Sequence, residues 1–246
     1  MSFQISVSDT KSEINLEYNE GIKLNGPYEM CLKSFVTYNN IPNITEKNNI
    51  IIFINVKLTE VNGKMVVAEG TIPSQHIINL PTGTYELNEI FKLITENPKI
   101  KNSNTVMRLN KNTFTVEIES EWYIDFTSPN SIGRTLGFSS NIFSPNKKNI
   151  SDLPVQLFTI NTIKIKCNLI KCNIDNLKRN DNTLYEFPLK CESGEKIIER
   201  PISLCYYPIN NDQIYQLHLR VVDQDDNLIS FRGEKITITL GFQPCV

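Results

Sequence analysis

Hydrophobic and polar residues alternate with a period of two over most of this chain. Successive side chains of a β-strand point to opposite faces of a sheet, so the alternation predicts half-buried strands in antiparallel sheets. It is clearest in TFTVEIE (113–119), INTIKIKCNLI (160–170) and ITITL (236–240). The side chains expected to face inward are Phe114, Val116 and Ile118, Ile163, Ile165 and Cys167, and Ile236, Ile238 and Leu240.

Several other segments have the composition of strands, and Asn-, Gly- and Pro-rich turns separate them. They are YEMCLKSFVTY (28–38), IIIFINV (50–56), KMVVAEGTI (64–72), TVMRL (105–109), YIDF (123–126), IERPISLCYY (198–207) and YQLHLRVV (215–222). About a dozen strands are too many for one open sheet. The sequence therefore predicts an all-β fold, an antiparallel jelly-roll-like β-sandwich or two packed β lobes.

One short amphipathic helix, near residues 85–96, is expected to interrupt the strands. Within PTGTYELNEIFKLITENP (81–98), Leu87, Ile90, Phe91 and Ile94 fall at i, i+3, i+4 and i+7, which places them on one face. Thr84 is the expected N-cap, and Asn97 followed by Pro98 is expected to end the helix.

A polar stretch without periodicity, SSNIFSPNKKNISDLPV at 139–155, suggests a boundary. The expected division is a β-rich lobe with the helix at 1–140, a connecting loop at 141–155 and a second β lobe at 156–246. A single continuous structural unit also fits this pattern.

The loop DQDDNLISFRGE (223–234) resembles a calcium-binding EF-hand loop, with Asp223, Asp225, Asn227 and Glu234 at positions 1, 3, 5 and 12. An EF-hand needs Gly at position 6 and a helix on each side, whereas Leu228 and strand-like flanks occur here. The pattern instead favours a β-hairpin with its turn at 224–227 and a bulge at Gly233. No metal site is expected.

No motif in the sequence indicates an enzyme or a cofactor site. His76 and His218 have no neighbouring Ser or Cys in a nucleophile motif, and no phosphate-binding or dinucleotide-binding glycine loop is present. Glu119 and Glu121 precede Trp122, but carboxylates on a strand are usually solvated. We therefore expect no catalytic residues.

Charge argues against nucleic acid and membrane as partners. The chain has 25 basic and 27 acidic residues and a net charge of −2. The basic pairs Lys147–Lys148 and Lys178–Arg179 are isolated. The start MSFQISVSDTKSE has no secretory pattern, and the apolar run at 50–56 is too short to span a bilayer.

Without a secretory route, the cysteines are expected to be reduced, free thiols. They are Cys31, Cys167, Cys172, Cys191, Cys205 and Cys245. Cys167 and Cys172 are five residues apart and would face opposite sides of a strand, so they cannot clamp one metal. The glycosylation sequons at Asn43 and Asn149 are expected to be unused.

Four phrases together carry a resemblance to a known family. They are YEMCLKSFVTYNNIPNI, IPSQHIINLPTGTYELNEIFKLI, YIDFTSPNSIGRTLGF and LRVVDQDDNLISFRGEKITITL, and the similarity covers residues 25–242. The chain resembles the small capsid-type proteins of Maverick/Polinton elements and adintoviruses. The resemblance implies a jelly-roll-related subunit of an icosahedral virion, a penton or another minor capsid protein.

The resemblance also implies partners and a location. The expected partners are further copies of the chain, in a homo-oligomer such as a pentamer, and other capsid proteins. Synthesis is expected in the host cytoplasm, with assembly in the nucleus. The missing basic arm suggests that this subunit does not itself bind the packaged DNA.

Two alternatives remain open. One is a compact major capsid protein, although the chain is short for two full jelly rolls. The other is a β-sandwich module that binds a glycan or a receptor, using aromatic side chains as anchors. The candidate anchors are Trp122, Tyr123, Tyr206, Tyr207 and Tyr215.

Overall fold

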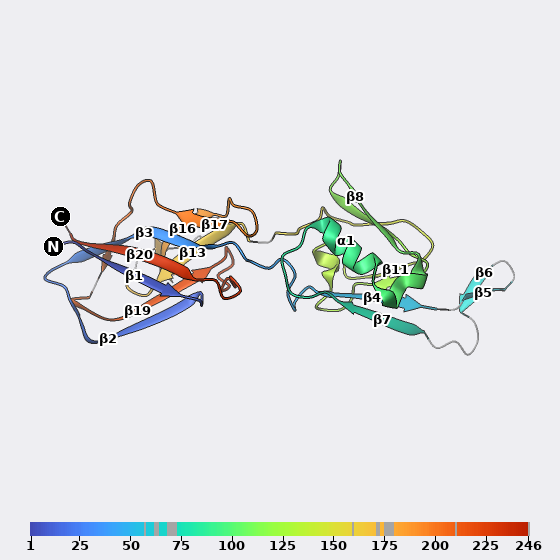
Figure 1. Cartoon of the computed structure of the whole chain (residues 1–246), viewed down its shortest axis with the longest axis horizontal. Coiled ribbons are helices and arrows are strands. Elements are labelled where there is room, and N and C mark those ends of the chain that lie inside the picture. The colour runs from blue at the N-terminus through green and yellow to red at the C-terminus, as the bar shows by residue number, and fades with distance from the viewer. Residues whose placement is uncertain are drawn as a thin grey trace. The chain divides into compact units, whose positions relative to one another are not determined.

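The fold was obtained as a computed structural model, which divides the chain into two compact units (Figure 1). It describes residues 1–56, 58–61, 64–67, 73–158, 160–170, 173–174, 180–209 and 211–245. Unit 1 comprises Met1–Ile41 and Ile160–Val246, and unit 2 comprises Pro42–Thr159. Unit 2 is therefore inserted in the sequence of unit 1.

Unit 1 is a sandwich of two antiparallel sheets. The first has the order β1-β20-β3-β17, with β18 also paired to β3, and the second has the order β16-β13-β19-β2. The strands of the first sheet are β1 (Phe3–Asp9), β3 (Tyr28–Tyr38), β17 (Lys196–Glu199), β18 (Tyr207–Ile209) and β20 (Ile236–Pro244). Those of the second are β2 (Glu13–Lys23), β13 (Thr162–Cys167), β16 (Thr183–Pro188) and β19 (Gln213–Val222).

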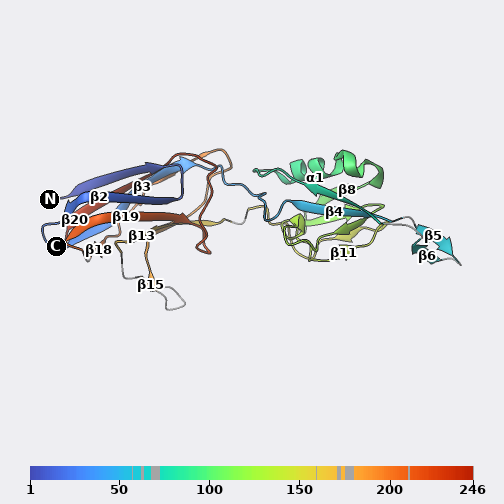
Figure 2. The ribbon, with the colours of Figure 1, turned by 90° about the horizontal axis from the view of Figure 1, so that it is seen from below.

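The order of these strands is that of a jelly roll. Along the chain, most strands of the sandwich are followed by a strand of the opposite sheet. There are two exceptions. β13 and β16 are neighbours in the second sheet, and β17 and β18 both pair with β3 in the first. Two interlocked Greek keys of this kind define the jelly roll. The predicted fold class is thus confirmed, and both chain termini lie at the same end of unit 1 (Figures 1 and 2).

This topology differs from the division expected around residues 141–155. The first strands, β1 and β2, pair with the last two, β20 and β19, and β3 also pairs with β20. Long-range pairing of this kind leaves no local trace in the sequence, because a strand's pattern records which face is buried and not which strand lies beside it. The polar stretch at 139–155 lies within unit 2.

The predicted hairpin of β19 and β20 is also wrong. β19 pairs with β13 and β2, whereas β20 pairs with β1 and β3, so the two strands belong to opposite sheets. The turn itself exists, but it crosses between the layers. Gly233 (φ +84°) lies in a second turn rather than a bulge, and the register shift in β20 occurs between Thr239 and Leu240.

Alternation decides which side chains form the core of unit 1. Ile236, Ile238 and Leu240 are fully buried, as predicted, and so are Ile163, Ile165 and Cys167. Lys166 is an exception, since it is only 7% exposed although it points away from this core. Its burial comes from the loop described below.

Unit 2 contains two further antiparallel sheets around a separate core. One has the order β11-β10-β4-β7 and the other β12-β9-β8. The strands of the four-stranded sheet are β4 (Ile50–Asn55), β7 (Ser74–Asn79), β10 (Tyr123–Asp125) and β11 (Ile142–Phe143). Those of the three-stranded sheet are β8 (Val106–Asn110), β9 (Thr115–Glu119) and β12 (Asn149–Ile150).

The predicted helix is α1 (Leu87–Thr95), and the four apolar residues predicted to share one face are all buried in the core of unit 2. Its N-cap is Glu86 and not Thr84, because the Glu86 backbone N–H donates to the Glu89 carboxylate at 2.8 Å in a capping box. Asn97 and Pro98 end the helix as expected, and a 3₁₀ helix, η1 (Pro98–Ser103), follows.

Three short elements complete the described fold. The 3₁₀ helix η2 (Ile132–Arg134) lies in unit 2, as does the hairpin of β5 (Leu58–Val61) and β6 (Lys64–Val67). A pair of two-residue strands, β14 (Asn173–Ile174) and β15 (Asn180–Asp181), lies in unit 1. The end of the predicted strand 64–72 lies outside the described residues.

Two predicted strand positions are wrong. Phe114 has a φ of +55° and sits 58% exposed in the turn before β9, so it does not join Val116 and Ile118 in the core. The segment 198–207 is not one strand, because β17 ends at Glu199 and β18 begins at Tyr207. Pro201 has no backbone N–H and cannot continue a ladder.

Candidate functional site

The Asp-rich loop is held together by hydrogen bonds of Asp223. One carboxylate oxygen, Oδ1, accepts from the backbone N–H of Asp225 at 2.8 Å and of Asn227 at 2.9 Å. The Asp223 N–H donates to the Asn227 carbonyl at 2.9 Å, and Asp226 adopts a φ of +65°. These are the contacts by which an Asp side chain closes a turn.

Glu234, the last of the four EF-hand-like positions, does not join the turn that Asp223 closes. Glu234 accepts a hydrogen bond from the Asn40 side chain at 2.6 Å, away from the turn that Asp223 closes. Among the described residues, no group of three or more His, Cys, Asp and Glu side chains is placed to hold a metal ion. That the loop binds no metal stays a prediction.

The turn has a second role, which the sequence did not reveal. Asp226 forms ion pairs with Lys166 at 2.8 Å and Lys164 at 3.5 Å, and Lys166 also reaches Asp181 at 3.1 Å. Lys164 also donates to the carbonyl of Gln224 at 3.0 Å. The loop thus folds over the outer side of β13. In the sequence, Lys164 and Lys166 alternate with the inward-facing isoleucines of β13, which indicates that they point outward. The sequence does not indicate their ion-pair partners, because these lie far away along the chain.

The ion pairs shift the pKa of both partners. Burial opposes the charged form of Asp226, but the hydrogen bonds and positive charges of Lys166 and Lys164 outweigh it and lower its pKa. Burial likewise disfavours the Lys166 ammonium, but Asp226 and Asp181 outweigh it and raise the pKa. Both shifts favour the charged pair.

Each histidine has a structural partner. The imidazole of His76 on β7 stacks on the indole of Trp122 with ring centroids 4.7 Å apart, and its Nε2 lies 3.3 Å from the Ser74 hydroxyl. His218 on β19 contacts a carboxylate oxygen of Glu13 at 3.1 Å. Among the hydrogen bonds of the described residues, none from a carboxylate orients the His76 ring toward Ser74, as a catalytic triad requires.

The remaining candidates are dispersed. Glu121 accepts a hydrogen bond from Asn104 at 2.6 Å, and Glu119 lies on β9 opposite Val106. Lys148, of the basic pair Lys147–Lys148, forms an ion pair with Glu117 at 2.7 Å. Its charge is therefore balanced within the chain. The pair Lys178–Arg179 lies outside the described residues.

The cysteines and sequons have structural surroundings. The described cysteines are free thiols, as predicted, and burial raises the pKa of Cys167 to about 12. Cys172 lies outside the described residues. Both sequon asparagines are buried: the Asn43 amide donates to the Tyr85 carbonyl at 2.7 Å, and the Asn149 amide donates to the Ser144 carbonyl at 3.0 Å.

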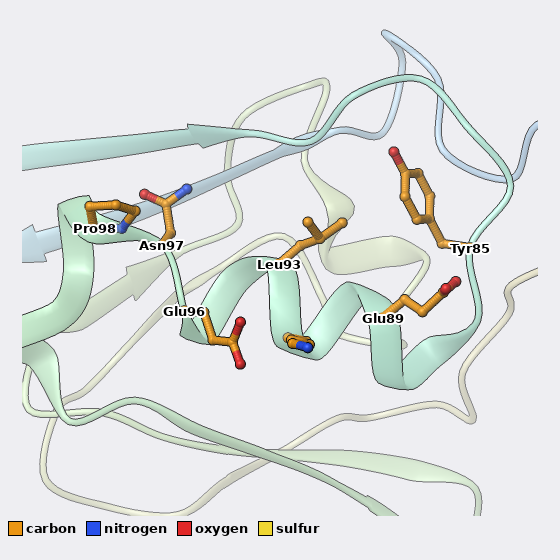
Figure 3. A pocket seen from close by; sticks show the side chains of 7 residues that line it. Tyr85, Glu89, Leu93, Glu96, Asn97 and Pro98 are labelled. Atoms are coloured by element: carbon orange, nitrogen blue, oxygen red, sulfur yellow. The ribbon is translucent and has the colours of Figure 1, made fainter.

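A shallow hollow lies beside α1 in unit 2 (Figure 3). The residues around it are Tyr85, Glu89, Lys92, Leu93, Glu96, Asn97 and Pro98. Its charged residues are common on the wet side of a helix, and nothing in it is arranged for chemistry. Among the described residues, no helix is both long and apolar enough to cross a membrane.

Unit 1 presents an apolar segment where β17 and β18 leave the central part of β3 unpaired on that side. We call it the β17–β18 edge and define it as Tyr38, Ile198, Ile202 and Leu204. All four side chains are exposed, and Ile202 is completely so. Nearby, the Lys33 ammonium lies 5.9 Å from the centre of the Tyr206 ring. Large contiguous apolar patches are typical of surfaces that bind other proteins, whereas single exposed apolar side chains are common on monomers.

A solved structure with a similar fold is the crystal structure of the mavirus penton protein. The TM-score is 0.50 with 11% sequence identity, and the alignment covers 100% of this chain and 100% of that one. The fold is penton-like. At this identity the likeness concerns the fold alone. No protein-family model matches the sequence, and no curated protein sequence matches it.

The penton-like fold extends over both units, because the alignment covers the whole chain. The inserted unit is therefore part of the shared architecture and not an addition to one protein.

Proposed function

We propose that this chain is a structural protein of an icosahedral virion, a penton or another minor capsid subunit that acts by symmetric self-association. The observation that carries the proposal is a jelly roll with an inserted unit, similar over its full length to the mavirus penton protein. The sequence resemblance to capsid proteins of Maverick/Polinton elements and adintoviruses supports the same role.

The surface of unit 1 supports assembly. A ring of identical subunits needs a contact on each side of the protomer, and apolar side chains in the centre of such a contact supply most of its free energy. The β17–β18 edge offers such side chains. A net charge of −2 allows several copies to approach without strong repulsion.

Two alternatives from the sequence receive less support. A double-barrel major capsid protein would need two jelly rolls, and the sheets of unit 2 have a different strand order. A glycan-binding module would need a free aromatic face, but one face of Trp122 is taken by His76.

The proposal includes location and partners. The protein is part of the virion with other capsid proteins as partners, and it is synthesised in the host cytoplasm and assembled in the nucleus.

Light scattering on the purified full-length chain tests this proposal. We expect a closed oligomer, with five times the mass of one chain as the favoured value. Ile202→Glu combined with Leu204→Glu should shift the oligomer toward monomer, because two carboxylates would replace apolar side chains in the contact. A matched control is Leu228→Glu, an exposed apolar residue of unit 1 outside this edge.

A chain that stays monomeric at high concentration, and is missing from purified particles, would refute the proposal. A density map of the particle with this chain on the fivefold axes would establish the penton role over other capsid positions.

A further inference from the structure

The outward side of the four-stranded sheet in unit 2 is apolar. The inward side chains of β4, Ile51 and Phe53, are fully buried in the core. The alternate residues point the other way and do not belong to that core. We call this outward surface the isoleucine face and define it as Ile52, Ile54, Ile77, Tyr123 and Ile142.

The strand register makes this surface continuous. Ile142, Asp125, Ile52 and Ile77 are successive cross-strand partners in one row, and Tyr123 and Ile54 are partners in the next row. Directly opposed side chains in a sheet lie about 4.5–5.5 Å apart between their Cβ atoms, so Ile52 meets Ile77 and Tyr123 meets Ile54, while Asp125 lies between Ile142 and Ile52. Ile77 is 41% exposed and Ile142 is 48% exposed.

The other sheet of unit 2 provides an internal comparison. The outward side of β9 and its neighbours carries Glu117 between Arg108 and Ile150, and Lys148 pairs with Glu117 at 2.7 Å. That face is charged at its centre, as expected for an antiparallel sheet that meets water on one side. The outward side of the four-stranded sheet carries mainly apolar side chains instead.

Among the described residues of β4, β7, β10 and β11, the isoleucine face exposes no charge that would select an oppositely charged partner. Its carboxylate, Asp125, is 8% exposed and accepts hydrogen bonds from the N–H of Thr127 at 2.8 Å and from its hydroxyl at 2.7 Å. A second copy of the chain would therefore meet no like-charge repulsion here. Apolar surface is what this face can bind.

Addition of a strand at the β7 edge of this sheet is hindered. β7 is the outermost strand, and the carbonyl of Ile77 accepts a hydrogen bond from the Lys99 ammonium at 2.7 Å. A lysine on an exposed edge is a common means of preventing strand pairing between molecules. Contact through the face is therefore favoured over contact through the edge.

Unit 2 also carries exposed apolar side chains at the margin of its three-stranded sheet. We call this set the margin patch and define it as Phe114, Ile150 and Leu153, which are 58%, 51% and 59% exposed. Residues 150–155 run beside β9, since Ser151 donates to the carbonyl of Val116 and Val155 donates to that of Phe114. The two sheets share one core, so the two surfaces lie on different sides of unit 2.

We propose that the isoleucine face of one copy docks against the margin patch of the next copy, head to tail. A closed ring requires two different surfaces on each subunit that complement each other. This inference rests on the proposed function and extends it, because it gives the inserted unit a part in the ring contact.

The size of the face predicts a weak contact. Four positions in one cross-strand row and two in the next, with strands about 4.8 Å apart and rows about 6.7 Å apart, cover on the order of 200 Å². This is smaller than the largest apolar patch of a typical monomer and well below the roughly 800 Å² per partner of a standard interface. The contact should therefore strengthen a ring that unit 1 also holds together, through an increased effective concentration.

Sedimentation of the full-length chain over a concentration series tests the inference with charge variants. Ile77→Lys and Leu153→Asp should each raise the dissociation constant of the oligomer about tenfold or more, because each places an unpaired charge in an apolar contact. The matched control Leu93→Lys places the same charge at an exposed apolar position of α1, outside both surfaces, and should have a much smaller effect. Circular dichroism should show that all variants are folded.

The combination of Ile77→Lys with Leu153→Asp separates head-to-tail docking from other contacts. In a head-to-tail ring the new lysine of one copy meets the region of the new aspartate of the next, so the double variant should associate more tightly than either single variant. A double variant that is at least as impaired as the worse single variant would overturn the proposal.

Two outcomes keep this inference distinct from the proposed function. A ring that forms with unchanged affinity in both single variants, and still depends on Ile202 and Leu204, refutes the docking but leaves the capsid role intact. A wild-type chain that stays monomeric at every concentration removes the basis of both.

Discussion

Two four-stranded sheets of this protein face their cores in the same way and differ on their outward sides. The sheet β16-β13-β19-β2 of unit 1 carries Lys164, Lys166 and Arg220 outward, and Glu186 and Glu13 lie opposite them. The sheet β11-β10-β4-β7 of unit 2 carries isoleucines at the equivalent places. The first surface satisfies its charges within the chain, whereas the second leaves apolar area uncovered.

The difference shows that a sheet can bury its inward side chains fully while its outward side leaves apolar side chains uncovered. Ion pairs such as Lys166–Asp226 are made within one chain, so they close the outer side of β13 whether or not a partner is present. Isoleucines cannot be satisfied in that way, because the free energy of burying them is gained only when another apolar surface covers them.

The largest expected effect separates the two sides of β4. Phe53→Ala should lower the free energy of unfolding of unit 2 by about 3–5 kcal/mol, because the fully buried ring would leave a cavity. Ile77→Thr on the outward side should change it by less than about 0.5 kcal/mol, since Thr keeps the β-branched shape at an exposed position. Denaturant unfolding followed by tryptophan fluorescence measures both, because Trp122 packs against the same core.

Comparable losses for the two variants would mean that the isoleucine face is buried within the isolated chain. The contrast between the sheets would then disappear.

An intermediate effect is expected in the ion-pair network of unit 1. Asp181→Asn combined with Asp226→Asn leaves the Lys166 ammonium buried without a carboxylate and should cost about 1–2 kcal/mol near neutral pH. The pKa of Asp226 is lowered in the folded state, so its contribution is present above the ordinary carboxylate range and is lost as the pH falls through the lowered pKa. The stability difference between wild type and variant should therefore shrink below about pH 4.

Thermal unfolding at a series of pH values measures this difference. Lys166→Met is the matched control: it removes the buried charge together with its desolvation cost and should be closer to neutral than the double aspartate variant. A difference that is constant from pH 7 to pH 3 would show that the network does not stabilise the folded state through charge.

The smallest effect is expected from calcium. The Asp223 carboxylate already accepts hydrogen bonds within the turn and Asp226 is paired with two lysines, so added calcium should leave the melting temperature unchanged. A real site at a hundred times its dissociation constant would stabilise the fold by about 2.7 kcal/mol, which is a shift of a few degrees. Such a shift, abolished by Glu234→Gln, would restore the EF-hand interpretation.

Local features of the fold were predictable. The strand pattern gave the inward residues of β13 and β20, and the helical spacing gave the buried face of α1, because both depend on which side chains repeat at a fixed interval. The two failures at Phe114 and at residues 198–207 arose where a turn interrupts a β-like composition.

The surfaces proposed for assembly were hidden for a different reason. The apolar run IIIFINV, which contains β4, predicts a strand buried on both faces. A continuous apolar run does not indicate whether one face of the strand is exposed. Only the register with β7 and β10 shows that Ile52 and Ile54 are on the outward side.

The sequence by itself determined the class of this protein: an antiparallel β fold with one amphipathic helix and no recognisable catalytic motif. The tertiary structure alone decided that β1 and β2 close a jelly roll with β20 and β19, that unit 2 interrupts it, and that Asp226 pairs with Lys166. The physical reason is the range of the interactions. Alternation records the burial of each residue in its own strand, whereas strand partners and ion pairs join residues that are distant in the chain and meet only when it folds.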